Sequence, residues 1–196
     1  MTCLLAIDCS TEAMCLALSR AGETLVVEGD GGAQASATLL PALLALLQRA
    51  GVTLDELDAI GFGRGPGAFT GLRTACSVAQ GLALGAGKPV LPLDSLLVVA
   101  QDAHDELGAA ASDCWVAMDA RMEEVYAAHY RFDEGAWLVL EAPMLCRPEE
   151  LNEHWSREAP RCVAGSALAS ALGLLWGLLA LLVIVVFLVI IGVDSI

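Results

Sequence analysis

The chain has 196 residues and a formal net charge of −14 at pH 7. This length suits one domain or two small ones. Because an acidic chain repels phosphate backbones, the charge argues against direct binding of nucleic acid without a partner.

Alternating strands and helices are predicted for the first half of the chain. Strands are expected at residues 3–8, 13–18, 25–28, 58–62 and 89–93. Helices are expected at 34–50, 74–84 and 95–107, the last capped by Asp94 and Ser95.

Local signals mark where these helices begin and end. Pro41 lies inside the first helix, which therefore either starts late or kinks there. Gly51 ends it, and residues 53–56 have the pattern of a capping box. Thr70 or Thr74 is the expected cap of the second helix.

After a small-residue linker at 108–112, the sequence resembles its own N-terminal segment. Residues 114–131 align on residues 3–20 without a gap, at an offset of 111, and the same residue recurs at six matched positions. Asp8 and Asp119 fall at the same strand-to-turn junction. The pattern predicts two related lobes that each open with a strand–Asp–turn–strand hairpin, and a chance match is the alternative.

Two such lobes are the plan of the actin-like ATPase and sugar-kinase superfamily. We therefore predict an α/β protein with two RNase H-like lobes of the actin-like ATPase type. The first covers 1–108, and the second, at 112–165, is truncated. In that plan the turn after the first strand of each lobe faces a central cleft and holds phosphate or metal.

The end of the chain differs from the rest. No charged residue occurs between Ser166 and Val193, and the apolar core of this run, 172–191, is long enough as a helix to span the roughly 30 Å of a bilayer. The expected helix at 167–193 has three interpretations: a membrane anchor, an unnatural junction such as a frameshift or chimera, or a buried helix of the second lobe. As an anchor, its basic flank predicts a cytoplasmic globular part tethered to the inner membrane.

The first candidate site is the turn that carries Asp8, Ser10 and Thr11. A carboxylate and two hydroxyls on a tight turn suit a phosphate with Mg²⁺. They equally suit an Asx or Ser/Thr turn that closes a hairpin.

The second and most specific candidate is a glycine-rich segment between a strand and a helix. Such a segment can cradle an anion or allow a partner to pack closely, or it can be a helix entry that needs positive φ. It lacks the Gly-Lys-Ser/Thr of a P-loop. Its candidate residues are Gly63, Arg64, Gly65, Pro66, Gly67, Thr70, Gly71 and Arg73.

The third candidate is the pair Asp119 and Arg121, which either faces the cleft opposite Asp8 or forms a surface ion pair. A metal site is not expected, because the three histidines are dispersed and the seven cysteines form no C-x-x-C pair. The cysteines indicate small buried thiols in a reducing cytoplasm.

Several of these segments resemble the bacterial TsaB (YeaZ) family. The likeness covers residues 1 to about 165 and rests on segments 5–8, 63–73, 79–83 and 119–126, in order and at the expected spacing. It implies a role in forming N6-threonylcarbamoyladenosine at position 37 of tRNAs that read codons starting with A. The resemblance further implies a non-catalytic scaffold, with catalysis by a TsaD paralogue and recruitment of the ATPase TsaE.

Other details agree with a scaffold. A metal-binding member has a His pair on the helix after the third strand, whereas this chain has no His in 34–41. No catalytic residue and no metal ligand is therefore assigned. No cofactor is assigned firmly, and ATP or ADP with Mg²⁺ in a degenerate cleft is left open. A homodimer and only indirect contact with tRNA are also expected. The alternatives are an actin-like phosphotransferase and a membrane-anchored interaction module.

Overall fold

The computed structural model describes residues 2–167, which divide into two compact units between Ser95 and Leu96. The division precedes the linker expected at 108–112, because helix α3 (Ser95–Leu107) packs into the core of the second unit. The apolar helix expected at 167–193 lies outside the described residues after its first position. Within residues 2–167, no helix is both long and apolar enough to cross a membrane.

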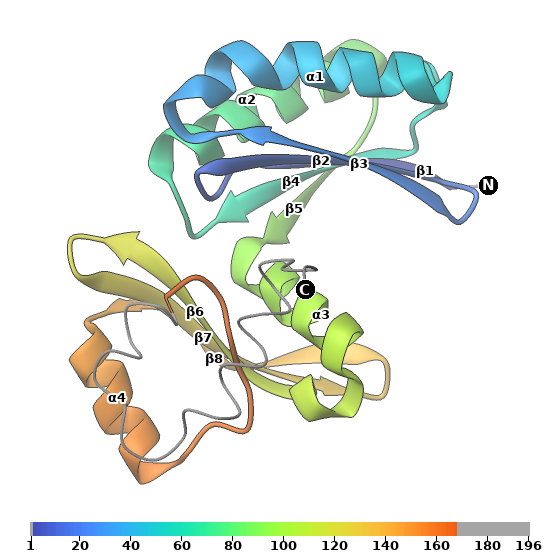
Figure 1. Ribbon diagram of the computed structural model, residues 1–196. Helices are drawn as coiled ribbons and strands as arrows, with labels where there is room; N and C mark the ends of the chain where they lie inside the picture. The colour runs from blue at the N-terminus through green and yellow to red at the C-terminus, as the bar shows by residue number, and fades with distance from the viewer. Residues whose placement is uncertain (1, 168–196) are drawn as a thin grey trace, which may run out of the picture. The chain divides into compact units, whose positions relative to one another are not determined.

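Five strands form the sheet of the first unit (Figure 1). They are β1 (Cys3–Asp8), β2 (Ala13–Arg20), β3 (Glu23–Asp30), β4 (Ala59–Gly65) and β5 (Val90–Asp94). Their order is β3-β2-β1-β4-β5, in which β1 to β3 form an antiparallel meander and β4 and β5 run parallel to β1. The five strands predicted for this half of the chain are confirmed.

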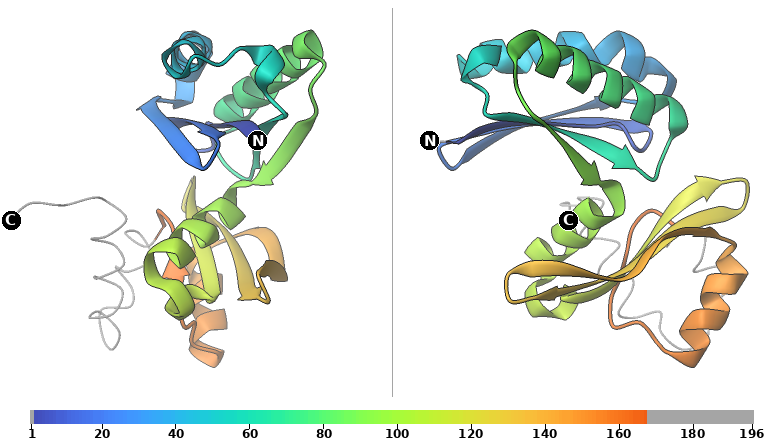
Figure 2. Two further views of the ribbon diagram at one scale, coloured as in Figure 1. Left: turned by 90° about the vertical axis from the view of Figure 1, so that its right-hand side faces the viewer. Right: turned by 180° about the vertical axis from the view of Figure 1, so that it is seen from behind.

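Two helices, α1 (Ala35–Ala50) and α2 (Phe69–Ala86), cover one face of this sheet (Figures 1 and 2). Every second side chain of β1 points to them, as the pleat of a strand requires. The helices contribute leucines and alanines at helical spacing. The buried core includes Cys3, Leu5, Ile7, Leu39, Leu43, Leu46, Ala75, Ala79 and Ala83.

The signals at the ends of α1 are confirmed in part. Gly51 has φ +62° and ends the helix, and Thr53 and Glu56 form the expected capping box around the short 3₁₀ helix η2 (Leu54–Glu56). Another 3₁₀ turn, η1 (Gly32–Gln34), precedes α1. The helix does not start late at Pro41, which lies inside it.

The cap expected for α2 is wrong. Neither Thr70 nor Thr74 caps the helix, because it begins at Phe69 with Ala68 in the cap position and no side-chain cap. The backbone N–H of Ala68 instead donates to the Ser10 carbonyl at 2.6 Å, so contact with the turn after β1 fixes where α2 begins. The Thr74 hydroxyl donates to the Thr70 carbonyl within the helix.

The second unit has a four-stranded sheet in the order β8-β7-β6-β9. Its strands are β6 (Asp113–Arg121), β7 (Glu124–Asp133), β8 (Ala136–Cys146) and β9 (Val163–Ala164). A 3₁₀ turn, η3 (Gly108–Ala111), joins α3 to β6, and α4 (Pro148–Arg157) lies between β8 and β9. The sequence analysis predicted the hairpin of β6 and β7 but not β8, α4 or β9.

Both faces of the second sheet are covered. Cys114, Val116 and Met118 of β6 join a core with α3, whereas Trp115 and Ala117 join a core with α4. The alternation explains why β6 is apolar at successive positions, since a strand covered on both faces has no solvent side.

The repeat predicted from the sequence is confirmed at the level of topology. In each unit three antiparallel strands are followed by a helix and by a strand parallel to the first. The matched residues also occupy matched positions, because Leu5 pairs with β4 where Val116, at the same offset of 111, pairs with β9.

Candidate functional site

Three parallel strands of the first unit end at the same edge of its sheet. β1 ends at Asp8, β4 at Gly65 and β5 at Asp94, and β4 lies between the other two. Ligand sites of open α/β sheets lie outside such carboxyl ends. This edge is therefore the candidate site of the first unit.

The carboxylate of Asp8 accepts hydrogen bonds from three donors. Its Oδ1 accepts the Ser10 backbone N–H at 2.8 Å and the Ser10 hydroxyl at 2.6 Å, and its Oδ2 accepts the Ser95 hydroxyl at 3.3 Å. Ser10 and Ser95 are only 6% and 4% exposed. Buried hydroxyls need partners, so Asp8 satisfies both and holds the turn.

Ser95 is a residue that the sequence analysis missed as part of this group. It was considered only as a helix cap. The signal that could have found it is its position directly after the strand expected at 89–93. The structure pairs this strand, β5, with β4, and the Ser95 hydroxyl reaches Asp8 at the end of β1.

The glycines of the segment 63–71 pack against the turn that follows β1. A Cβ added at Gly63 would overlap the Asp8 carboxylate, one at Gly67 would overlap Ser10, and one at Gly71 would overlap the Cys9 carbonyl oxygen. Side chains are therefore excluded at three positions for one reason, which is the close approach of two backbone segments.

Gly65 and Pro66 shape the exit from β4. Gly65 has φ +97°, in the region that favours glycine, and it lies where the register between β4 and β5 shifts. The Gly65–Pro66 peptide bond is cis.

The polar side chains of the segment point to the surface. Arg64 lies 3.9 Å from Asp94 and is more than half exposed. Arg73 stacks over the exposed Phe69 ring at 4.0 Å from the ring centroid, and Thr70 is exposed beside it. On the preceding turn, Thr11 is also exposed and its hydroxyl accepts the Ala13 N–H at 3.1 Å. These groups are accessible to a partner, and their contact with one stays a prediction.

Asp119 and Arg121 occupy the corresponding turn of the second unit. The Asp119 carboxylate accepts the Arg121 backbone N–H at 2.7 Å, and its own N–H donates to the Ser166 hydroxyl at 3.2 Å. Both residues are exposed. The turn passes through three successive left-handed residues, Arg121, Met122 and Glu123.

A second polar group, which the sequence analysis missed, lies at the start of β6. Asp113 accepts hydrogen bonds from His129 at 2.7 Å and from Arg131 at 2.9 and 2.7 Å. Burial would raise the pKa of the Asp113 carboxyl, but the hydrogen bonds and charges of His129 and Arg131 outweigh it and lower that pKa. The group lines a cavity of about 430 Å³ with Trp115, whose ring stacks on His129 at 4.8 Å.

Between residues 2 and 167, no cluster of three or more His, Cys, Asp or Glu side chains is placed to hold a metal ion. Both carboxylate oxygens of Asp8 accept hydrogen bonds from Ser10 or Ser95. In the described conformation, Asp8 therefore supports the turn through these hydrogen bonds.

Comparison with known proteins places the chain among its relatives. A family profile described as "TsaD: tRNA N6-adenosine threonylcarbamoyltransferase" matches residues 32–173. The tRNA threonylcarbamoyladenosine biosynthesis protein TsaB of Haemophilus influenzae is 38% identical over 84% of this chain and 72% of that protein. The chain belongs to the TsaB family. The TsaB protein of Escherichia coli is also 38% identical, over 76% of this chain and 64% of that protein.

Solved structures agree with this membership. YeaZ from Pseudomonas aeruginosa matches with a TM-score of 0.74 and 35% identity, covering 90% of this chain and 92% of that one. The resemblance to the TsaB (YeaZ) family and the actin-like α/β fold are thereby confirmed. These relatives give no support to a phosphotransferase or a membrane-anchored interaction module.

Proposed function

We propose that the chain is a non-catalytic scaffold subunit in the formation of N6-threonylcarbamoyladenosine at position 37 of tRNAs that read A-starting codons. In this role it pairs with a TsaD-like paralogue, which carries out the transfer, and with a TsaE-like ATPase. The observation that carries the proposal is the 38% identity to a TsaB protein over 84% of the chain, which spans both units.

The first unit supports a role other than catalysis. The Asp8 carboxylate, its candidate acid, accepts hydrogen bonds from two serine hydroxyls, and backbone of the neighbouring glycine segment packs close to it. A general acid or base needs a proton within reach of substrate. In the described conformation Asp8 instead supports the turn.

The outer faces of α1 and α2 offer a surface for a partner. Leu40 and Leu44 of α1 are 42% and 49% exposed, and Phe69 and Leu84 of α2 are 68% and 87% exposed. On α2, Phe69 and Leu84 lie within about 60° of each other around the helix axis, on one stripe. Large apolar side chains gathered on one helical layer mark an interaction surface.

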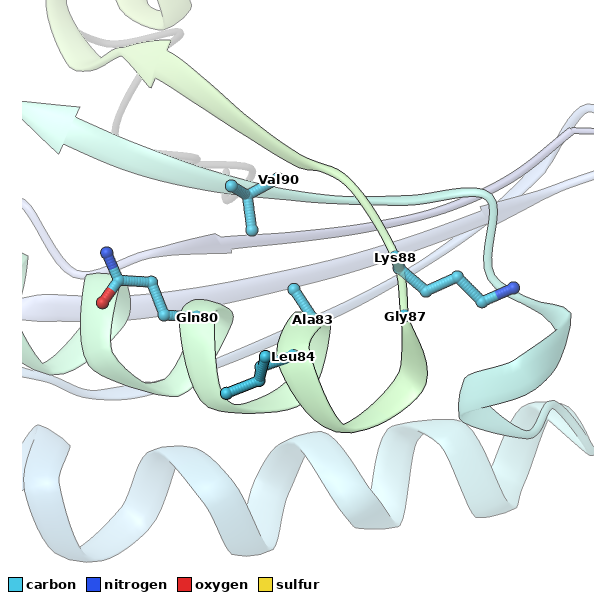
Figure 3. A pocket seen from close by; sticks show the side chains of 6 residues that line it. All are labelled: Gln80, Ala83, Leu84, Gly87, Lys88 and Val90. Atoms are coloured by element: carbon cyan, nitrogen blue, oxygen red, sulfur yellow. The ribbon is translucent and has the colours of Figure 1, made fainter.

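A shallow groove of about 360 Å³ lies at the C-terminal end of α2 (Figure 3). Gln80, Ala83 and Leu84 of α2 line one side, and Val90 of β5 lies across from them, with Lys88 on the connecting segment. The groove gives an incoming apolar side chain a place next to Leu84.

A TsaD-like paralogue suits this surface because it is related to this chain and has the same type of fold. A TsaD family profile matches the chain itself, so such a paralogue shares its arrangement of helices on a sheet. Two related subunits can pair through equivalent helical faces, as in an isologous dimer. The acidic charge of −14 leaves tRNA contact to the partner, so this chain meets tRNA indirectly. A cytoplasmic location follows from the role, and a tether through 167–193 stays a prediction.

Co-purification with a TsaD homologue tests the proposal. The full chain, kept in mild detergent because of its apolar segment 172–191, is mixed with tagged TsaD homologue and resolved by size exclusion. A stable heterodimer is expected. Titration calorimetry should show that Leu84→Asp weakens binding about tenfold or more, because a charge is then buried in an apolar contact.

Val139→Asp is the matched control, since Val139 is 57% exposed on β8 of the second unit. It should leave the affinity unchanged. A folded chain that does not bind the homologue would overturn the scaffold proposal, whereas equal weakening by both variants would reject only the assigned surface.

A further inference from the structure

Two cysteines far apart in the sequence meet in the core of the second unit. Cys114 lies on β6 and Cys162 directly precedes β9, and their sulfur atoms are 3.5 Å apart. The Cys114 side chain is 0% exposed and Cys162 is 8% exposed. All seven cysteines of the chain are free thiols.

The backbone holds the two residues side by side. β6 and β9 are parallel, with Trp115 opposite Val163, and the Trp115 N–H donates to the Cys162 carbonyl at 3.0 Å. Both cysteines belong to the buried apolar cluster that also holds Val116 and Ala164, and the Cys114 thiol donates to the Trp115 carbonyl at 3.3 Å. Bringing the sulfurs to bonding distance therefore needs only a side-chain adjustment.

The two thiols differ in reactivity. The hydrogen bond between them raises the pKa of Cys114 and lowers the pKa of Cys162, which makes Cys162 the more acidic thiol of the pair. Elsewhere, burial and the charge of Asp8 raise the pKa of Cys9 to about 11, and burial also raises the pKa of Cys15 and Cys146. The pair therefore combines a thiol of lowered pKa with a second sulfur atom at 3.5 Å.

The pair lies at the start of the last described segment, residues 162–167. β9 pairs with β6 at two positions, Val163 with Trp115 and Ala164 with Val116. After it, the Ala167 N–H donates to the Ala117 carbonyl at 3.1 Å and the Ser166 hydroxyl accepts the Asp119 N–H. A covalent link at Cys162 would therefore fix residues 162–167, including the contact with the Asp119 turn.

We propose that Cys114 and Cys162 are a site of reversible oxidation, at which a peroxide converts the two thiols into a disulfide that fixes residues 162–167 on β6. The Cys162 thiolate attacks a peroxide oxygen, so that an S–O bond forms, the O–O bond breaks and water leaves after protonation. The Cys114 sulfur then attacks the sulfenic sulfur, so that the S–S bond forms and the hydroxyl leaves as a second water with the Cys114 proton. Two thiols are oxidised and one hydrogen peroxide is reduced to two waters. In a reducing compartment the disulfide is transient.

Mass spectrometry of the full chain tests the proposal. After treatment with equimolar hydrogen peroxide and alkylation of the remaining thiols, the monomer should contain five alkylated cysteines instead of seven and should have lost about 2 Da for the two hydrogens removed. Fragmentation of the digested, unreduced wild-type chain should identify the Cys114–Cys162 link. Hydrogen exchange should then be slower at the Trp115 and Ala167 amides in the oxidised chain.

Variants sharpen the result. Cys114→Ser and Cys162→Ser should each abolish the intramolecular link, whereas Cys76→Ser, outside the pair, should keep it. Mapping the wild-type chain needs no variant, so it decides the matter even if a serine in the core prevents folding. The proposal is overturned if a folded wild-type chain keeps seven alkylatable thiols, or if the disulfide joins other cysteines.

Discussion

The turns at Asp8 and Asp119 begin with the same local hydrogen bond and end in different surroundings. In both, Oδ1 of the aspartate accepts the backbone N–H two residues further on, at 2.8 Å from Ser10 and 2.7 Å from Arg121. Around Asp8, a glycine segment and two buried serines close the space. Asp119 remains exposed. A repeated motif thus keeps its local geometry, while the segments packed on it decide whether it supports the core or faces solvent.

The largest loss of stability should follow from adding a methyl group where the glycine segment 63–71 packs on the turn after β1. In Gly71→Ala, the new Cβ would overlap the Cys9 carbonyl, so we expect a loss of about 3 kcal/mol in the free energy of unfolding. Urea denaturation followed by circular dichroism measures it. Gly81→Ala in the same helix is the control, because nothing lies within 4 Å of its added Cβ, and it should stabilise the chain by about 0.5–1 kcal/mol. Equal effects of the two variants would contradict the packing role.

Removing each aspartate compares the two turns directly. Asp8→Ala leaves the buried Ser10 and Ser95 hydroxyls without their acceptor, and we expect a loss of about 2 kcal/mol. Asp119→Ala removes one exposed bond and should change stability by no more than about 0.5 kcal/mol. Thermal and urea unfolding of the pair provide the test. A larger effect at Asp119 would reverse our ranking of the turns.

Asp113 lies at the opposite end of β6 from Asp119, and its effect on the stability of the chain should depend on pH. The pKa of Asp113 is lower in the folded chain than in the unfolded chain, so its stabilising effect is fully present above about pH 4 and is lost as pH falls through the folded pKa. Asp113→Asn should therefore be less stable than the natural chain by about 1 kcal/mol at pH 7, with the gap narrowing as pH falls below about 4. Denaturation at a series of pH values measures the gap. A gap that stays constant down to pH 2.5 would mean that charge is not its source.

The smallest effect should come from the exposed rim of the first turn. Arg64 is 59% exposed and 3.9 Å from Asp94, and such surface pairs contribute little. Arg64→Ala should change the unfolding free energy by less than about 0.5 kcal/mol. Any change in its affinity for a partner would then not result from unfolding. A loss above about 1.5 kcal/mol would show that the rim supports the fold.

Local pattern predicted much of the first unit. The apolar strand at residues 3–8, the helix-ending glycine at 51 and the capping box at 53–56 were each predicted from neighbouring residues, and the structure confirms them. The start of α2 escaped prediction because a contact with Ser10, more than fifty residues earlier, fixes it rather than a threonine cap. Long-range contact overrode a local preference.

The polar groups show the same limit. Ser10 was predicted beside Asp8 because the two are neighbours in sequence, whereas Ser95 joins them only through the parallel pairing of β4 and β5. The Asp113 group was missed because its members come from two strands whose register the sequence does not state. Pairing register, more than residue type, is what the sequence left open.

The glycines of α2 have a consequence for how its surface is used. Gly81 and Gly85 lie in open space near the C-terminal end, and each lowers helix propensity by about 1 kcal/mol relative to alanine. The turn that bears Leu84 therefore depends on the packing of Leu82 and Ala83 against the core. We expect it to open more readily than the middle of the helix. A protein that docks in the groove must order this turn as it binds, so part of the binding energy is spent on preorganisation. Alanine at both positions would order this turn before the partner binds. The complex would then be tighter although no contact is added.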